Sequence, residues 1–208
     1  MPLDIERFVR LRPVLYHLTA TSNAVRIRDT GLIYPASALY RSAGIAPSIR
    51  ARRAEGQWIE IGGERVHIRD QAPLHRGNIT FSGGWEFEDL VAHLNDHVFF
   101  WPGTTGGPIS YGRRHFERYA GDDAVVLCLD TRAIFAANTD PGPRFCKYNS
   151  GSPRCTGGRG SPRGPDTFLD ADGFPHRPSE VIEVTYPDVV RLDGCEIGER
   201  PVSDFAGG

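Results

Sequence analysis

The sequence lacks the cysteine spacing of a metal site or of a redox motif. Its four cysteines include no Cys-x-x-Cys pair, and none lies at metal-ligand spacing from a histidine. Cys128 falls within the apolar run Val125–Leu129, so we expect a buried core thiol there. This use of cysteine is typical of a reduced, cytoplasmic setting, and we expect no metal cofactor.

Long apolar runs are also missing. No stretch approaches the roughly 20 residues that a membrane-spanning helix needs, and Met1–Glu6 lacks the basic and apolar regions of a secretory signal. The net charge of −2 excludes a generally basic nucleic-acid binder but leaves room for a local basic patch. With 39% hydrophobic residues in 208, we expect one domain over residues 1–192 and a polar, fraying tail over 193–208.

The standard nucleotide-binding and hydrolase motifs are absent. The sequence contains no Walker loop, no Gly-x-Gly-x-x-Gly that opens a helix and no Gly-x-Ser-x-Gly. Short strands and helices follow one another without regular alternation, which favours a mixed α+β fold over a doubly wound sheet. The expected strands cover 14–19, a hairpin at 58–68 around Gly62-Gly63, 97–101, 125–129 and 181–185, and the expected helices cover 21–30, 35–44, 85–94, 110–119 and 131–135.

The most unusual segment runs from residue 136 to residue 178, where Gly and Pro recur and no periodicity survives. Structureless segments of this length are uncommon in compact domains and are usually functional or disordered. The segment leads into 179–184, which the pattern predicts as a strand that points Glu180 and Glu183 to opposite faces. We interpret it as a mobile lid ahead of a catalytic acid. The alternative is a surface loop before an edge strand with two solvated glutamates.

Positive charge gathers in this loop. Between Pro141 and Pro165 no Asp or Glu occurs, while basic and aromatic residues interleave. Such a mixture suits a nucleic-acid strand, because it neutralises phosphates and offers a stacking face. A loop that is charged only for solubility is the alternative. The residues predicted to bind the substrate are Arg144, Lys147, Tyr148, Arg154, Arg159 and Arg163.

Two other groups of residues suit an anionic ligand. His17 and Thr19 share one face of the first strand, beside a helix N-terminus that favours anions. They either hold a ribose or a phosphate, or they are a core histidine and a capping threonine. The run Arg50–Arg53 either clamps a pyrophosphate through bidentate guanidinium contacts or forms a solvated helical face.

These features together resemble the DarT-type ADP-ribosyltransferases, bacterial toxins that modify DNA bases using NAD. The order and approximate spacing of the shared motifs cover most of the chain. An uncharacterised bacterial family with the same outline is similar as well, at Ile68–Gln71 and Asn95–Trp101. The motifs that carry the DarT resemblance are Tyr16-His17-Leu18-Thr19 followed by Asn23, Ile27 and Gly31-Leu32, then Arg50–Arg53, Val98–Pro102 and Ser179-Glu180-Val181.

The resemblance implies an ADP-ribosyltransferase-like fold, with two small mixed sheets flanked by short helices around an NAD cleft. It implies that Glu180, rather than Glu183, is the catalytic glutamate, and that it acts with Arg52 and Arg53. The loop before Glu180 would then recognise the substrate. The residues implied to bind NAD, the co-substrate, are His17, Thr19, Asn23, Arg50, Arg52, Arg53 and Phe99.

The function expected on this basis is transfer of ADP-ribose from NAD to a nucleobase in single-stranded DNA or RNA. The protein would be a toxin or defence protein with an antitoxin partner and no membrane association. The segment Trp101–Pro108 and the Gly- and Arg-rich loop depart from the DarT pattern, so a protein acceptor or simple NAD hydrolysis stays open. A non-catalytic nucleotide- or nucleic-acid-binding protein is the third alternative, although the retained Glu180 and arginine run argue against it.

Overall fold

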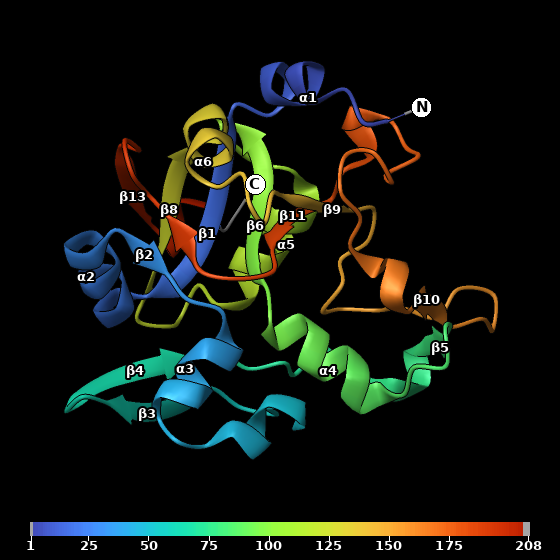
Figure 1. Cartoon of the computed structure of the whole chain (residues 1–208), viewed down its shortest axis with the longest axis horizontal. Helices are drawn as coiled ribbons and strands as arrows, with labels where there is room; N and C mark the ends of the chain where they lie inside the picture. Colours follow the sequence, from blue (N-terminus) through green and yellow to red (C-terminus); the bar gives the residue numbers. More distant parts are fainter. Residues whose placement is uncertain (1, 206–208) are drawn as a thin grey trace.

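The computed structural model describes residues 2–205 and has the mixed α+β fold that the sequence predicts. Its centre is one seven-stranded sheet rather than the two small mixed sheets expected (Figure 1). The strand order is β13-β8-β1-β6-β11-β9, with β7 beside β6, and every pairing in it is antiparallel. The strands are β1 (Val14–Ala20), β6 (Val98–Thr104), β7 (Gly107–Pro108), β8 (Ala124–Asp130), β9 (Arg144–Cys146), β11 (Glu183–Tyr186) and β13 (Ile197–Pro201).

Alternation along the strands divides the side chains of the main sheet between two apolar layers. Leu15, Phe100 and Leu127 belong to one buried cluster, which α1, α2 and α6 cover. Tyr16 and Trp101 belong to the other, which α5 and η5 cover. The sheet is therefore a platform that is packed on both faces. The covering helices are α1 (Ile5–Leu11), α2 (Thr21–Thr30), α5 (Ser110–Arg118), α6 (Thr131–Ala137) and the 3₁₀ turn η5 (Val202–Phe205).

The helices are short, as their sequence signals predict. Helix α2 ends at Gly31, whose φ of 65° is the left-handed conformation that a glycine C-cap provides. Helix α4 (Phe87–Asn95) begins with a capping box, in which the main-chain N–H of Glu86 donates to the Asp89 carboxylate at 2.9 Å. Within the described residues, no helix is both long and apolar enough to cross a membrane.

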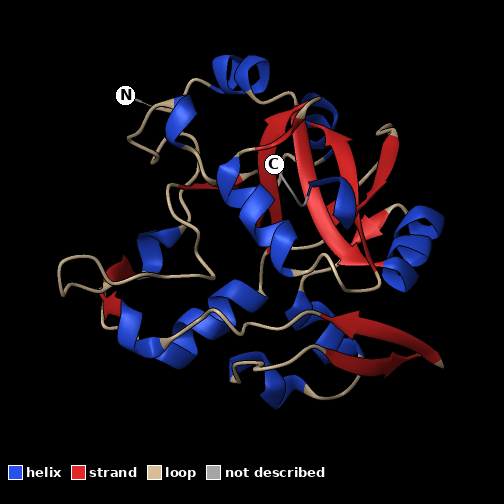
Figure 2. Ribbon diagram, turned by 180° about the vertical axis from the view of Figure 1, so that it is seen from behind, coloured by secondary structure: helices blue, strands red, loops and turns tan. Residues whose placement is uncertain are grey.

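A smaller body lies beside the main sheet (Figures 1 and 2). It consists of the hairpin β3 (Gln57–Ile61) and β4 (Glu64–Ile68), with α3 (Ala36–Ser42) and the 3₁₀ turn η1 (Ala46–Arg50). The predicted Gly62-Gly63 turn is confirmed, with φ angles of 60° and 86°. This body has its own buried cluster, formed by Tyr40, Ile59, Val66 and Ile68. Two separately packed bodies thus face each other.

The stretch 136–178 contains regular structure, contrary to expectation. Strand β9 joins the main sheet, and β10 (Ser161–Arg163) runs parallel to β5 (Ile79–Phe81). The physical reason is the burial of apolar side chains, since Phe145, Phe168 and Phe174 are buried and anchor the segment to the core. The remaining short elements are β2 (Leu32–Ile33), which pairs with β12 (Val190–Arg191), and the 3₁₀ turns η2 (Arg76–Asn78) and η3 (Pro165–Thr167).

The strand expected at 179–184 begins only at Glu183. Before it, Pro178–Glu180 forms the 3₁₀ turn η4, and the Glu180 carboxylate accepts the main-chain N–H of Arg177 at 2.9 Å. Proline in the first position and glutamate in the third are a helix-start pattern, which outweighed the strand signal. Glu180 is therefore an exposed capping residue and not a strand residue.

The fraying tail expected from residue 193 is wrong for its described part. Strand β13 pairs along β8 from Ile197 opposite Leu129 to Pro201 opposite Val125. The next turn, η5, buries Val202 and Phe205 against the second apolar layer. A few apolar residues in a polar segment are enough to anchor it to the sheet. Residues 206–208 of the expected tail lie outside the described part of the chain.

Candidate functional site

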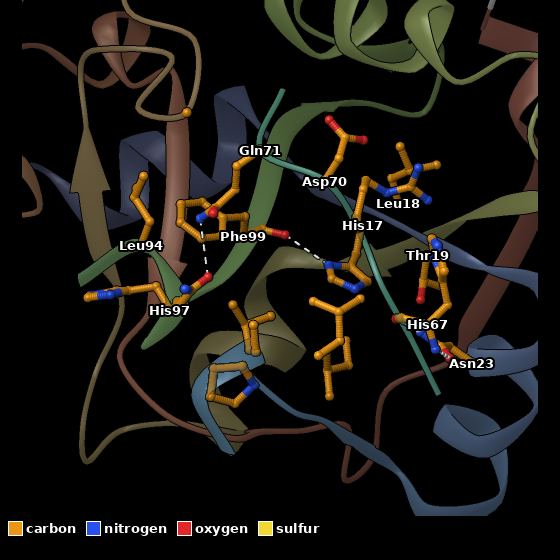
Figure 3. Close-up of a pocket in the computed structure, with 18 of the residues that line it drawn as sticks. His17, Leu18, Thr19, Asn23, His67, Asp70, Gln71, Leu94, His97 and Phe99 are labelled. Atoms are coloured by element: carbon orange, nitrogen blue, oxygen red, sulfur yellow. Dashed lines mark hydrogen bonds between the residues drawn. The ribbon is translucent and has the colours of Figure 1, made fainter. Parts of the chain in front are cut away.

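A cleft lies between the main sheet and the hairpin body, with a cavity volume of about 280 Å³ (Figure 3). Strands β1, β6 and β11 supply one wall, and the end of β4 with the turn after it supplies another. Helices α2, α3, α4 and α5, strand β2 and the loop 149–152 also contribute to the lining. Five of the seven residues predicted to hold NAD line this cleft, and so does Glu183; the five are His17, Thr19, Asn23, Arg53 and Phe99.

Glu183 is a buried carboxylate in the cleft lining. It stands at the start of β11 and is 3% exposed. The main-chain N–H of Ser150 points between its two carboxylate oxygens, at 3.1 and 3.2 Å. Burial raises the pKa of Glu183 to about 7, although hydrogen bonding from Ser150 and the positive charge of Arg163 oppose the rise. A group with such a pKa can both take up and release a proton near neutral pH.

Arg163 holds the loop that reaches Glu183. Its side chain is 2% exposed, and it donates to the main-chain carbonyls of Asn149 at 2.9 Å, Ser150 at 3.4 Å and Pro162 at 2.7 Å. The sequence predicted a substrate-binding role, which requires an accessible guanidinium. Its buried position favours a structural role, because all three contacts join loop to loop. The rigid fork of five donors instead ties the 149–150 segment against Glu183.

His17 is held in one tautomer. Its Nδ1 lies 2.9 Å from the main-chain carbonyl of Phe99, across the β1–β6 pair (Figure 3). Because a carbonyl only accepts, Nδ1 donates, and Nε2 of the neutral ring is left as an acceptor. Burial lowers the pKa of His17 to about 4, so the ring is neutral at physiological pH. Thr19, two residues along the same strand, is also buried in the cleft wall.

The three arginines of the predicted pyrophosphate clamp do not lie together in the cleft. Arg53 lines the cleft, but its Nε donates to the main-chain carbonyl of Arg69 and its Nη1 to the side chain of Asn95, both at 2.8 Å. Its guanidinium also lies 5.7 Å from the centre of the Tyr40 ring. Arg53 therefore fastens the hairpin body to α4 through two of its donors.

The other two arginines of the run lie outside the cleft lining. Arg52 donates to two main-chain carbonyls of the turn after β4, at 3.2 and 2.7 Å. Arg50 is exposed and pairs with Asp89 at 2.6 Å. Their contacts fit a structural role at the surface, which is the alternative that the sequence left open.

Asn23 lines the cleft, where it clasps the hairpin body. Its side-chain amide donates to the main-chain carbonyl of His67 at 2.7 Å, and its carbonyl accepts the N–H of the same residue at 3.0 Å. Both ends of the amide are thus occupied by β4. The contact to the adenosine end of NAD that the resemblance implies would have to compete with these bonds.

Sequence reasoning missed a charged and aromatic cluster at the end of the cleft near α5. Arg69 stacks over Tyr119, with 4.3 Å between guanidinium and ring centre, and pairs with Asp122 at 3.3 Å. His115 packs on Tyr119 and Trp101, with ring centres 5.1 and 5.3 Å apart. Burial lowers the pKa of His115 to about 3. The signal was weak, because these residues come from three parts of the chain: the turn after β4, strand β6, and α5 with the turn that follows it.

The exposed part of the basic loop is smaller than the sequence predicted. Arg144 pairs with Asp170 at 2.9 Å. Lys147, Arg154 and Arg159 are exposed. Tyr148 is half-buried, with the Arg163 guanidinium 4.7 Å from its ring centre. Three exposed basic side chains therefore remain near the loop 149–152, whereas the sequence suggested five.

Acid should destabilise the protein through its cleft histidines. Burial lowers the pKa of His17 and His97 to about 4 and that of His115 to about 3, from 6.5. The stability gained by keeping them neutral is fully present above pH 6.5. It is lost as the pH falls from 6.5 through the lowered pKa values of the folded state. Glu183 acts oppositely, because its raised pKa adds stability below pH 4.5 that is lost as pH rises through about 7. Near pH 5.5, these four groups together should make unfolding take up about two protons.

The proton uptake follows from the pH dependence of the unfolding free energy in urea. The Glu183→Gln variant should raise the uptake by about one proton, because the opposing group is gone. The His97→Asn variant should lower it by about one proton. Stability that stays flat between pH 4 and 6.5 would contradict the assignment of buried neutral histidines.

One protein-family model matches the part of the chain that forms the cleft. A protein-family model with the description "Family of unknown function (DUF7002)" matches residues 13–192, which include every residue that lines the cleft. No curated protein and no solved structure gives a significant match. Among the described residues, no group of three or more His, Cys, Asp or Glu side chains is placed to hold a metal ion.

Proposed function

The chain belongs to this family of unknown function, and we propose from the geometry of its cleft that it is an NAD-dependent ADP-ribosyltransferase. One observation carries the proposal. The buried carboxylate of Glu183 lines the same cleft as His17 and Thr19, with only β6 between their strands. The role that the resemblance gave to Glu180 passes in this proposal to Glu183, because Glu180 caps a surface turn outside the cleft lining.

The residues of the cleft fit a ligand with both aromatic and hydroxyl groups. Phe99 and Trp101 present aromatic surface to the cavity. A carboxylate accepts hydrogen bonds at both of its oxygens, so Glu183 can accept a ribose hydroxyl as well as the main-chain N–H of Ser150. These features support a nicotinamide–ribose group next to Glu183.

NAD would supply a ribosyl carbon whose bond to nicotinamide breaks, with the electron pair leaving on nicotinamide. Glu183 then stabilises the positive charge that develops on the ribose, in a site with little water to compete. As the acceptor nitrogen forms its bond to the same carbon, Glu183 takes up the proton that the nitrogen loses. Its pKa of about 7 suits both steps, since ionised and protonated forms are both accessible.

His17 and Thr19 orient the ligand in this proposal. With Nδ1 committed to Phe99, Nε2 of His17 accepts a hydrogen bond from a ribose hydroxyl. Thr19 offers a hydroxyl two residues further along β1. Both residues lie on a strand of the packed sheet, so little of their freedom is lost on binding.

We propose a single-stranded nucleic acid as the acceptor. Lys147, Arg154 and Arg159 are exposed on the loop that continues into the Ser150 segment. Tyr148 lines a second cavity of about 230 Å³ together with Lys147, beside Arg163. An aromatic face among cations suits a base and its phosphates, and an unpaired base avoids the cost of leaving a duplex.

The protein incubated with NAD and short single-stranded DNA or RNA should release nicotinamide and add ADP-ribose to the oligonucleotide. Chromatography follows the nicotinamide, and mass spectrometry follows the oligonucleotide. Because phosphate contacts release counterions, transfer should weaken steeply as salt rises.

Two other results would redirect the proposal. Nicotinamide release without a modified oligonucleotide would support NAD hydrolysis or a protein acceptor. Absence of nicotinamide release, with millimolar NAD leaving the melting temperature unchanged, would exclude NAD as the co-substrate.

A further inference from the structure

Arg26 is a cation of the cleft whose buried N–H groups are not all used. It lies on α2 and lines the end of the cavity formed by α2, β2 and α3. Its guanidinium is 5.8 Å from the centre of the Tyr34 ring, which holds it over that wall. Nη1 is buried and has no hydrogen-bond partner in residues 2–205. A guanidinium donor in this position is costly until an acceptor reaches it.

The other two arginines of the cleft lining are held by contacts within the protein. Arg53 donates to main-chain and side-chain oxygens of the protein, and Arg69 is stacked on Tyr119 and paired with Asp122. Neither can turn toward a ligand without breaking these contacts. Among the described cleft arginines, the buried N–H group without an acceptor therefore lies at the Arg26 end of the cavity.

The surroundings of Arg26 suit a phosphate next to an apolar group. Ile33, Pro35 and Leu39 line the same end of the cavity. Apolar walls strengthen a charge-assisted hydrogen bond, because they exclude the water that would otherwise compete. A phosphate joined to an aromatic base and sugar satisfies both the free donor and the apolar wall.

We propose that this end of the cleft is a phosphate subsite for nucleoside diphosphates, in which Nη1 of Arg26 donates to a phosphate oxygen. The subsite rests on the proposed function in one respect, since NAD contains such a diphosphate. The Arg26 subsite also takes the place of the pyrophosphate clamp expected at Arg50–Arg53, because those arginines donate hydrogen bonds to oxygens of the protein. Its ligand contact requires no transfer chemistry, so binding alone tests it.

Calorimetric titration of the full chain with ADP, and separately with adenosine, tests the subsite. The Arg26→Gln variant should weaken ADP binding by about 10- to 100-fold, the usual cost of a hydrogen bond to a charged group. Adenosine binding should change by less than about threefold, because it carries no phosphate. Arg26→Lys should recover part of the ADP affinity, since it restores the charge without the planar fork.

Arg28→Gln is the matched control. It removes the same charge from the same helix, but Arg28 is exposed, pairs with Glu199 and lies outside the cleft lining. ADP affinity should stay within about threefold of the wild type. Melting temperatures of all three variants establish that they fold.

Three results would overturn the subsite: failure of the wild type to bind ADP, equal weakening of ADP and adenosine by Arg26→Gln, or no effect of Arg26→Gln. The proposed function fails separately. ADP binding that depends on Arg26, without nicotinamide release from NAD, retains the subsite and removes the transferase. Nicotinamide release with a KM for NAD that Arg26→Gln leaves unchanged removes the subsite and retains the transferase.

Discussion

The Glu183→Gln variant should release nicotinamide from NAD about 10³-fold more slowly than the wild type, within the range for losing a general base or a charge-stabilising group. Glutamine keeps the shape of the side chain and can still accept the N–H of Ser150, so the fold should persist. It cannot carry the negative charge or take up the proton. Steady-state kinetics should show the loss in kcat, with the KM for NAD changing little.

The matched control is Glu180→Gln. Glu180 is exposed and caps the turn before β11, so its loss should leave kcat within about twofold. The two variants make the same chemical change three residues apart, and only one lies in the cleft. A larger loss from Glu180→Gln, or equal losses, would return the catalytic role to Glu180.

Stability gives a second readout for Glu183. Because burial raises its pKa to about 7, ionising it costs stability as pH rises through that value. Glutamine has no such cost, so Glu183→Gln should be more stable than the wild type at pH 8 and nearly equal at pH 5. A residue that lowers stability while it serves the reaction is common in active sites.

Arg163→Gln should have the largest effect on stability. It leaves main-chain carbonyls of the 149–150 segment without a buried donor, which should cost about 2–5 kcal/mol of unfolding free energy. Loss of the positive charge should raise the pKa of Glu183 further, because that charge now lowers it. Urea denaturation measures the stability, and the pH profile of nicotinamide release measures the pKa.

Two variants separate charge from surface effects. Arg163→Lys keeps the charge, so the pH profile should return toward that of the wild type while the stability stays low. Arg159→Gln, an exposed change in the same loop, should alter the unfolding free energy by less than about 0.5 kcal/mol. Equal destabilisation by Arg159→Gln and Arg163→Gln would show that the loop is not held by the buried guanidinium.

Local sequence signals predicted the elements that depend on near neighbours. The hairpin around Gly62-Gly63 and the glycine that ends α2 were both found, because turn and cap chemistry depends on a few adjacent residues. The strand positions of His17 and Thr19 were predicted for the same reason, as alternate residues of a strand that leads into a helix.

Contacts between residues far apart in sequence determine which of the predicted site residues are buried and which are exposed. Arg163 and Arg159 are the same residue type in one Gly-rich loop, yet one is buried and the other exposed, and only packing against the Ser150 segment distinguishes them. Glu180 and Glu183 differ because the turn at Pro178 delays the strand by a few residues. A carboxylate inside the apolar run from Val181 to Val184 was the available signal, since buried acids are rare outside functional sites.

The last strand of the sheet also guards against self-association. Strand β8 is a seven-residue, mostly apolar strand, and without β13 its N–H and C=O groups would be an open template for a second chain. Strand β13 closes that edge and presents a poorer one of its own, with charged Glu199 and Arg200 followed by Pro201, which has no N–H to offer. A protein shortened after residue 192, where the family match ends, would keep its cleft residues and lose its protection from aggregation.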